Sequence, residues 1–221
     1  MRPPTIGLVT YQRCTLVTLN EIEMSRLSAH DEPMEPGGRT PAPKPLRLVQ
    51  GFENTYDALT DDEGLTAPAD LLGWAKRNGL VQVRATSAQF AGLLEFRETL
   101  RAVLRAHNGM PLDTVALDSL NGLCASAEVG VSFSRRGRPV ITSAPEGADG
   151  VVIGAILEAA LIGARDGSWE RLKACPACGW VFFDHSRNRS GTWCTMAICG
   201  SRAKMKAYRK RRIRGSDERT P

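Results

Sequence analysis

Four cysteines near the C-terminus constrain the fold of this chain more than any other feature. They form a C-x-x-C pair and a C-x4-C pair with fifteen residues between the pairs: Cys175, Cys178, Cys194 and Cys199. Two thiolates on one tight turn can occupy adjacent corners of a tetrahedron, and a hairpin-length insert can bring the second pair to the other corners. The spacing therefore predicts one zinc ion held by four thiolates.

Two disulfides, or burial without a metal, are the alternatives for these cysteines. Disulfides require an oxidising compartment, and the apolar stretch at the N-terminus is broken by Tyr11, Gln12 and Arg13, which is not typical of a secretory leader. We therefore expect zinc and a cytoplasmic location. Four thiolates leave no zinc position for water or substrate, so the metal is expected to be structural. His185 is a competing ligand.

The residues between and after the cysteines predict a hairpin followed by a helix. An apolar, strand-like run, Trp180–Phe183, leads into a polar turn, and Thr195 is suited to be the N-cap of a proline-free helix. This order is typical of a treble-clef finger. At about 100° per residue, Cys194 and Cys199 would lie on different faces of one helix. We therefore expect Cys194 to precede the helix and Cys199 to lie in its first turns.

The predicted C-terminal helix is strongly cationic. It has eight basic residues and no acidic residue among them: Arg202, Lys204, Lys206, Arg209, Lys210, Arg211, Arg212 and Arg214. Residues 171–214 carry twelve basic residues and one acidic residue, a formal charge of +11, and since the whole chain has +5, the remainder has −6. A solvated helix usually mixes charges of both signs. This asymmetry indicates a polyanionic partner such as a nucleic acid.

The motifs around the cysteines are similar to a known finger. C-x-x-C-G-W-x-F-x-D-x-S-R-N-R begins at Cys175, and W-C-x-M-x-x-C-G-S-R-A-K-x-K-x-Y-R begins at Trp193. Both resemble the CGNR zinc finger of bacterial proteins that carry an N-terminal ABATE domain, a family described as stress-induced transcriptional regulators. The segment LRLVQGFENT, from Leu46, resembles the start of that domain, with departures at Gln50 and Gly51.

The resemblance implies one structural zinc ion on the four cysteines and a nucleic-acid contact surface on the basic helix and the loop before it. The implied contact residues are Arg187, Arg189, Ser201, Arg202, Lys204, Lys206, Arg209, Lys210, Arg211, Arg212 and Arg214. The asparagine of the family's signature is Ser201 here. Ser201 and Arg202, near the start of the helix, are the expected contacts to base edges, whereas the other cations contact phosphates.

Hydrophobic periodicity predicts a mostly helical domain before the finger. Apolar residues recur at intervals of three and four in most of this region, and they alternate around one basic, glycine-bearing turn. The expected helices cover residues 68–79, 87–107, 111–127 and 150–165, and the expected β-hairpin covers residues 129–144. The fold class is therefore α+β and mostly helical: a helical ABATE-like domain with one β-hairpin, followed by a small treble-clef-like four-cysteine zinc finger with a basic C-terminal helix.

These elements divide the chain into four parts. They are a flexible, partly proline-rich N-terminal leader (1–45), the ABATE-like helical domain (46–168), the CGNR-type finger with its basic helix (169–214) and a tail (215–221). The connection between the helical domain and the finger has about six residues, which is short enough to hold the finger at a fixed angle to that domain. We nevertheless expect metal removal to unfold residues 173–214 and leave the helical domain folded.

Basic residues in the helical domain admit more than one interpretation. Arg97 lies inside an apolar helical stripe, where pairing with Glu95, Glu98 or another carboxylate is expected and binding of an acidic ligand is the alternative. Arg135, Arg136 and Arg138, at the tip of the predicted hairpin, either extend the nucleic-acid surface or keep the exposed tip soluble.

We expect a zinc-dependent DNA-binding protein that acts as a bacterial transcriptional regulator. The alternatives are an RNA-binding or ribosome-associated finger and a protein-binding adaptor; a homodimer and a small-molecule effector stay open. No membrane span is expected, because the longest apolar run, Val151–Ala164, is too short and contains Glu158. Common catalytic motifs are absent and the three histidines are scattered, so we do not expect an enzyme.

Overall fold

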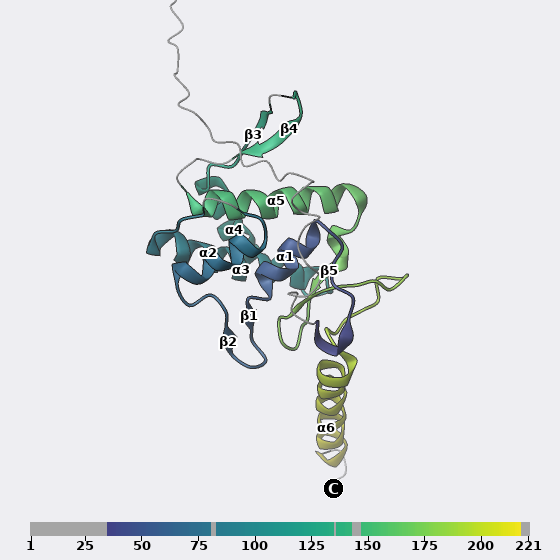
Figure 1. Ribbon diagram of the computed structural model, residues 1–221. Helices are drawn as coiled ribbons and strands as arrows, with labels where there is room; N and C mark the ends of the chain where they lie inside the picture. Colours follow the sequence, from purple (N-terminus) through teal and green to yellow (C-terminus); the bar gives the residue numbers. More distant parts are fainter. Residues whose placement is uncertain (1–34, 81–82, 135, 143–146, 218–221) are drawn as a thin grey trace, which may run out of the picture.

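The computed structural model describes residues 35–80, 83–134, 136–142 and 147–217, which form a helical body with small hairpins (Figure 1). The helices are α1 (Leu46–Glu53), α2 (Pro68–Arg77), α3 (Ser87–Ala106), α4 (Thr114–Ser126), α5 (Ala148–Asp166) and α6 (Ser201–Asp217). The antiparallel hairpins are β1 (Tyr56–Asp57) with β2 (Asp62–Glu63), β3 (Gly130–Phe133) with β4 (Pro139–Thr142), and β5 (Leu172–Ala174) with β6 (Val181–Phe183). Single 3-10 turns cover Pro36–Gly38 and Trp169–Arg171, and a π-type turn covers Met196–Gly200. The predicted fold class is confirmed.

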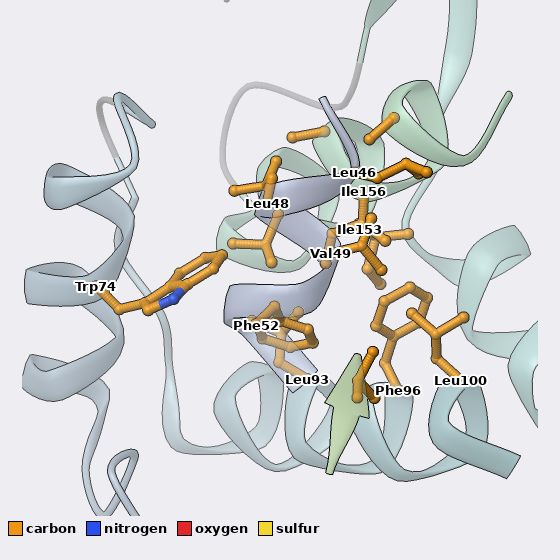
Figure 2. Packing of buried hydrophobic residues seen from close by; sticks show 14 of the residues in the cluster. Leu46, Leu48, Val49, Phe52, Trp74, Leu93, Phe96, Leu100, Ile153 and Ile156 are labelled. Atoms are coloured by element: carbon orange, nitrogen blue, oxygen red, sulfur yellow. The ribbon is translucent and has the colours of Figure 1, made fainter. Parts of the chain in front are cut away.

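The hydrophobic core is built around α1 (Figure 2). Leu46, Val49 and Phe52 of this helix are at most 1% exposed. They are surrounded by large side chains of three other helices: Trp74 of α2, Leu93, Phe96 and Leu100 of α3, and Ile153 and Ile156 of α5. The sequence did not predict α1, because Gln50 and Glu53 are buried on the same short helix and break its apolar pattern.

The predicted helices over 68–79, 87–107, 111–127 and 150–165 are present as α2 to α5. The start of α3, the longest of them, is fixed by a capping box. The Thr86 hydroxyl accepts a hydrogen bond from the Gln89 N–H at 3.2 Å, and Gln89 Oε1 accepts one from the Thr86 N–H at 3.0 Å. Two donors that the first helical turn would leave without partners are therefore satisfied locally.

The hairpin β1–β2, which the sequence did not predict, brings Glu63 to Arg97 of α3. Arg97 donates hydrogen bonds of 2.8 and 2.6 Å to the two carboxylate oxygens of Glu63 and one of 3.0 Å to Glu98. Burial raises the pKa of Glu63, but the hydrogen bonds and the charge of Arg97 outweigh it and lower the pKa overall. The expected pairing of Arg97 with carboxylates is confirmed.

The hairpin predicted over residues 129–144 is present as β3–β4. Its register pairs Gly130 with Thr142 at the base of the hairpin. Figure 1 shows this hairpin at the end of the body opposite to α6. Arg136 and Arg138, beside its turn, therefore do not form one continuous surface with the cations of α6, and Arg135 lies outside the described residues.

The hairpin β5–β6 of the finger is part of the main core. Leu172, Ala174 and Val181 are fully buried, and Phe183 is 5% exposed. All four belong to the hydrophobic cluster of α1, α3 and α5, and β5 and β6 contact α3 and α1 directly. The finger is therefore held by shared apolar packing as well as by its short connection.

The end of the leader also packs onto this body, although the sequence placed all of residues 1–45 in a flexible segment. Ala42 is fully buried, and its N–H donates a 2.7 Å hydrogen bond to Oε1 of Gln50. Residues 35–45 are therefore structurally part of the body, and residues 1–34 lie outside the described part of the chain. Among the described residues, no helix combines the length and apolarity that crossing a bilayer needs.

Candidate metal centre and nucleic-acid interface

The four cysteines predicted to bind zinc lie together in one buried cluster. The Sγ atoms of Cys175, Cys178, Cys194 and Cys199 are all within 4.8 Å of one another. The Sγ of Cys194 lies 3.5 Å from that of Cys178 and 3.6 Å from that of Cys199. Four thiolates bound to zinc at about 2.3 Å have sulfur–sulfur edges of about 3.8 Å. The cluster therefore fits one tetrahedral zinc ion.

The electrostatics of the thiols also favour a cation in this cluster. Hydrogen bonds from Cys178 and Cys194 lower the pKa of Cys175. The hydrogen bond to Cys175 raises the pKa of Cys178 to about 12, and those to Cys175 and Cys178 raise the pKa of Cys194. Without a cation, ionisation of one of these three thiols opposes ionisation of the other two, because buried thiolates repel one another. A bound divalent cation removes that penalty.

The first cysteine pair lies in a knuckle that glycine closes. The Gly179 N–H donates to the carbonyl of Cys175 at 2.8 Å, and the Cys175 N–H donates to that of Trp180 at 2.9 Å. Gly179 has a φ of 76°, and a Cβ there would lie 3.3 Å from the side chain of Arg101. The left-handed backbone and the close approach of Arg101 both favour glycine at this position.

The second pair spans the start of the C-terminal helix, as predicted. Cys194 precedes the helical segment, and Cys199 lies in the π-type turn Met196–Gly200 that leads into α6. Thr195 occupies the N-cap position, but its side chain makes no capping hydrogen bond. The Ser201 hydroxyl instead donates a 3.1 Å hydrogen bond to the first carbonyl of the π-type turn. Ser201 therefore stabilises the junction between the metal centre and α6.

Aromatic side chains shield the thiols from solvent. Phe182 is fully buried beside them, and Trp180 and Trp193 pack against the same cluster. His185, the competing ligand, is exposed, and its Nε2 lies 3.2 Å from the carbonyl oxygen of Thr40. It is not among the grouped metal-ligand atoms of the described residues.

A buried ion pair holds the loop between β6 and Trp193. Lys173 Nζ donates hydrogen bonds to Asp184 Oδ2 at 2.8 Å and to the carbonyl of Gly191 at 3.0 Å. Burial opposes ionisation of Asp184, but hydrogen bonds from Lys173, Ser186 and the loop backbone outweigh it and lower its pKa to about 2. Lys173 is therefore a structural cation, not a free basic group on the finger surface.

Side chains of the helical domain bind the backbone of the knuckle. Asn54, after α1, donates from Nδ2 to the carbonyl of Val181 and accepts from its N–H, both at 2.8 Å. Arg101 of α3 donates to the carbonyl of Gly179 at 2.8 Å and to that of Glu53 at 2.6 Å. These contacts tie the two helices that dominate the core to the turn that carries the first two cysteines.

Two further side chains hold the other parts of the finger. Asn108, after α3, donates to the carbonyl of Ala174 at 3.0 Å. Arg39, from the described end of the leader, donates to the carbonyl of Trp193 at 3.1 Å and lies 4.5 Å above the ring of Phe182. The sequence did not reveal these contacts. Its only signals were that Asn108 follows the predicted helix over residues 87–107 and that Asn54 lies in the segment LRLVQGFENT.

The basic residues predicted to contact nucleic acid gather mainly on α6, which extends away from the body (Figure 1). Seven basic side chains from Arg202 to Arg212 are exposed, and the helix packs chiefly against the π-type turn before it. The exposed residues are Arg202, Lys204, Lys206, Arg209, Lys210, Arg211 and Arg212. Arg214 also lies on α6, and its side chain is outside the described part of the structure.

The two arginines predicted on the loop before this helix differ from each other in their contacts. Arg187 is exposed on the loop between β6 and Trp193. Arg189, on the same loop, donates a 3.2 Å hydrogen bond to the carbonyl of Gly167 and lies 3.9 Å from a carboxylate oxygen of Glu170. Arg189 therefore also has a structural role.

Two protein-family models match this chain, one over the finger and one over the helical domain. The CGNR zinc finger matches residues 171–212, and ABATE, described as "Putative stress-induced transcription regulator", matches residues 46–165. No curated protein that was compared matches the chain. The family predicted from the motifs is therefore confirmed. Because the second match spans more than half of the 221 residues, the chain belongs to the ABATE family and ends in a CGNR zinc finger.

Proposed function

We propose that this protein is a zinc-dependent transcription regulator that binds duplex DNA through α6. The observation that carries the proposal is the set of seven exposed basic side chains from Arg202 to Arg212, among which no acidic residue lies. Like charges at this density destabilise a helix. Phosphate contacts relieve the repulsion and release counterions, which makes association with a polyanion favourable.

In this proposal the zinc ion is structural and the protein is not an enzyme. Four thiolates close the coordination sphere, so no substrate can reach the metal. The ion holds the π-type turn before α6, and the contacts of Asn54, Arg101 and Arg39 hold the finger against the helical body. These contacts fix the position of the finger from which α6 starts, so DNA bound to α6 takes a defined orientation relative to the helical body.

The proposal is tested by the salt dependence of affinity for a random-sequence DNA duplex. In a plot of the logarithm of the association constant against the logarithm of the salt concentration, the wild-type protein should have a negative slope. Replacing Arg209, Lys210, Arg211 and Arg212 by alanine should make this slope less negative by roughly 0.9 for each phosphate that is no longer neutralised. A charge-matched control replaces four exposed cations outside the finger: Lys76, Arg77, Arg84 and Arg138. The control variant should keep the slope of the wild-type protein.

Equal slopes for the two variants and the wild-type protein would remove α6 from the interface. A structured RNA that displaces the duplex at equal salt would favour the RNA-binding alternative. If neither nucleic acid binds and an acidic protein does, the adaptor alternative stands instead.

A further inference from the structure

A stripe of uncharged side chains runs along α6 between its cations. Ser201, Met205 and Tyr208 are spaced by four and three residues, which returns each to the same side of an α-helix at about 100° per residue. Ile198, in the π-type turn before α6, lies beside Ser201 and Met205. Ile198 is 40% exposed, Met205 53% and Tyr208 51%. Large apolar groups at this spacing usually face a core, yet these are exposed.

A shallow hollow lies on this side of the helix. It has a volume of about 710 Å³, and its lining includes Ile198, Ser201 and Met205. Three cations, Arg202, Lys206 and Arg209, also line it. The apolar stripe and the basic residues therefore form one surface, with uncharged groups at its centre and positive charge at its border.

The charges beside the stripe decide what can cover it. Lys204 and Arg211 lie on one flank and Arg202 and Arg209 on the other, at the positions that flank the seam of a two-helix coiled coil. In a pair of identical helices these four positions would place only positive charges opposite one another, which is destabilising. Charge complementarity therefore disfavours a second copy of α6 and favours a groove with a negatively charged wall on each side.

We propose that this stripe enters the major groove of duplex DNA and that Met205 and Tyr208 contact base edges, an inference that rests on the function proposed above. The major groove is about 12 Å wide and admits one α-helix, with a phosphate backbone on each side. Lys204 with Arg211, and Arg202 with Arg209, then contact the two backbones. The Met205 side chain suits the thymine methyl group, and the Tyr208 hydroxyl can donate to or accept from a base edge.

The test places the same side chain on opposite sides of α6. Met205→Gln changes the stripe, whereas Ala207→Gln, about 200° further round the helix, changes the other side; both positions are exposed and neither change alters the charge. Duplexes selected by the zinc-loaded wild-type protein from a random library, and scrambled versions of them, are the probes. Met205→Gln should reduce the discrimination between selected and scrambled duplexes at least tenfold, and Ala207→Gln should leave it unchanged. In both variants, the dependence of DNA affinity on salt concentration should be the same as in the wild-type protein.

Replacing thymine by deoxyuridine in the selected duplex supplies a second measurement, because it removes only the methyl group from the major groove. The wild-type protein should lose affinity, and Met205→Ala should be insensitive to the replacement. The inference is overturned if selection returns no preferred sequence while duplex binding persists, or if Ala207→Gln is the more damaging change. It is also overturned if sedimentation shows a dimer that Met205→Gln dissociates. Absence of any duplex binding would instead defeat the proposed function.

Discussion

At the scale of single residues, Glu53 at the end of α1 is the least expected side chain. It is fully buried, and among the described residues neither of its carboxylate oxygens has a hydrogen-bond partner. Arg101 Nε lies 3.7 Å from Oε2, too far for a good hydrogen bond. Burial raises the pKa of Glu53 to about 8, although the charge of Arg101 opposes the shift. We therefore expect a neutral carboxyl group here at neutral pH. The charge of Arg101 is then balanced by Glu98, whose Oε2 lies 3.1 Å from Arg101 Nε.

This interpretation predicts a pH-dependent difference between the wild-type protein and Glu53→Gln. The folded protein keeps the proton of Glu53 up to about pH 8, whereas the unfolded chain releases it near pH 4.5. The stability of the wild-type protein therefore falls as the pH rises through this window. Glutamine cannot ionise, so the free energy of unfolding of the variant, relative to wild type, should rise by a few kcal/mol over that range.

Urea unfolding at several pH values, with zinc saturating throughout, measures this difference. Glu128→Gln, at an exposed position, is the control and should show no such trend. A constant difference between Glu53→Gln and the wild-type protein over the window would show that Glu53 is ionised in the folded state.

At the scale of elements, local patterns identified most of the fold and missed its centre. The long helices α3 and α5 have enough turns for their apolar periodicity to stand out, and the four cysteines define the finger by spacing alone. The helix α1 has only eight residues, and its buried Gln50 and Glu53 conceal it. The contact of Asn54 with Val181 joins residues 127 positions apart. No pattern among neighbouring residues in the sequence predicts such a contact.

The helix α6 packs chiefly against the π-type turn before it, and this predicts how its amides exchange with solvent. A helix with so little tertiary packing is marginally stable in water, and repulsion between like charges weakens it further. Amide protons of residues 203–214 should therefore exchange fast in the free zinc-loaded protein. They should be protected when duplex DNA neutralises the cations.

Hydrogen exchange followed by mass spectrometry tests this prediction, with the buried helix α3 as the internal reference. The segment 93–104 should be protected with and without DNA. Protection of α6 in the free protein equal to that of α3 would mean that another surface of the protein already stabilises it.

At the scale of the whole molecule, the finger and the helical domain share one core. From the sequence, metal removal was expected to unfold residues 173–214 alone. The structure leads to a different expectation, because Leu172, Val181 and Phe183 of the finger hairpin pack in the cluster of α1 and α3. Loss of the knuckle also removes the backbone partners of Asn54 and Arg101. Loss of the metal should therefore destabilise the helical domain as well as the finger.

Cys178→Ser should accordingly destabilise the whole protein. Zinc binding by four thiolates contributes on the order of 10 kcal/mol in isolated fingers, and we expect the variant to lose at least about 3 kcal/mol of global stability. The measurement is thermal and urea unfolding with hydrogen exchange of α1 and α3. Cys124→Ser, outside the cysteine cluster, is the control. Full protection of α3 in Cys178→Ser, with residues 173–199 exchanging freely, would show an independent finger.

The central claim is that a metal-held finger aims α6 at DNA, and one titration tests it most directly. Fluorescence anisotropy of a short labelled duplex would be followed with zinc-loaded protein at about 0.15 M ionic strength, then after chelation and again after zinc is restored. We predict salt-sensitive binding that disappears with the metal and returns with it. Binding that is absent from the zinc-loaded protein, or that is unchanged by chelation, would contradict the account.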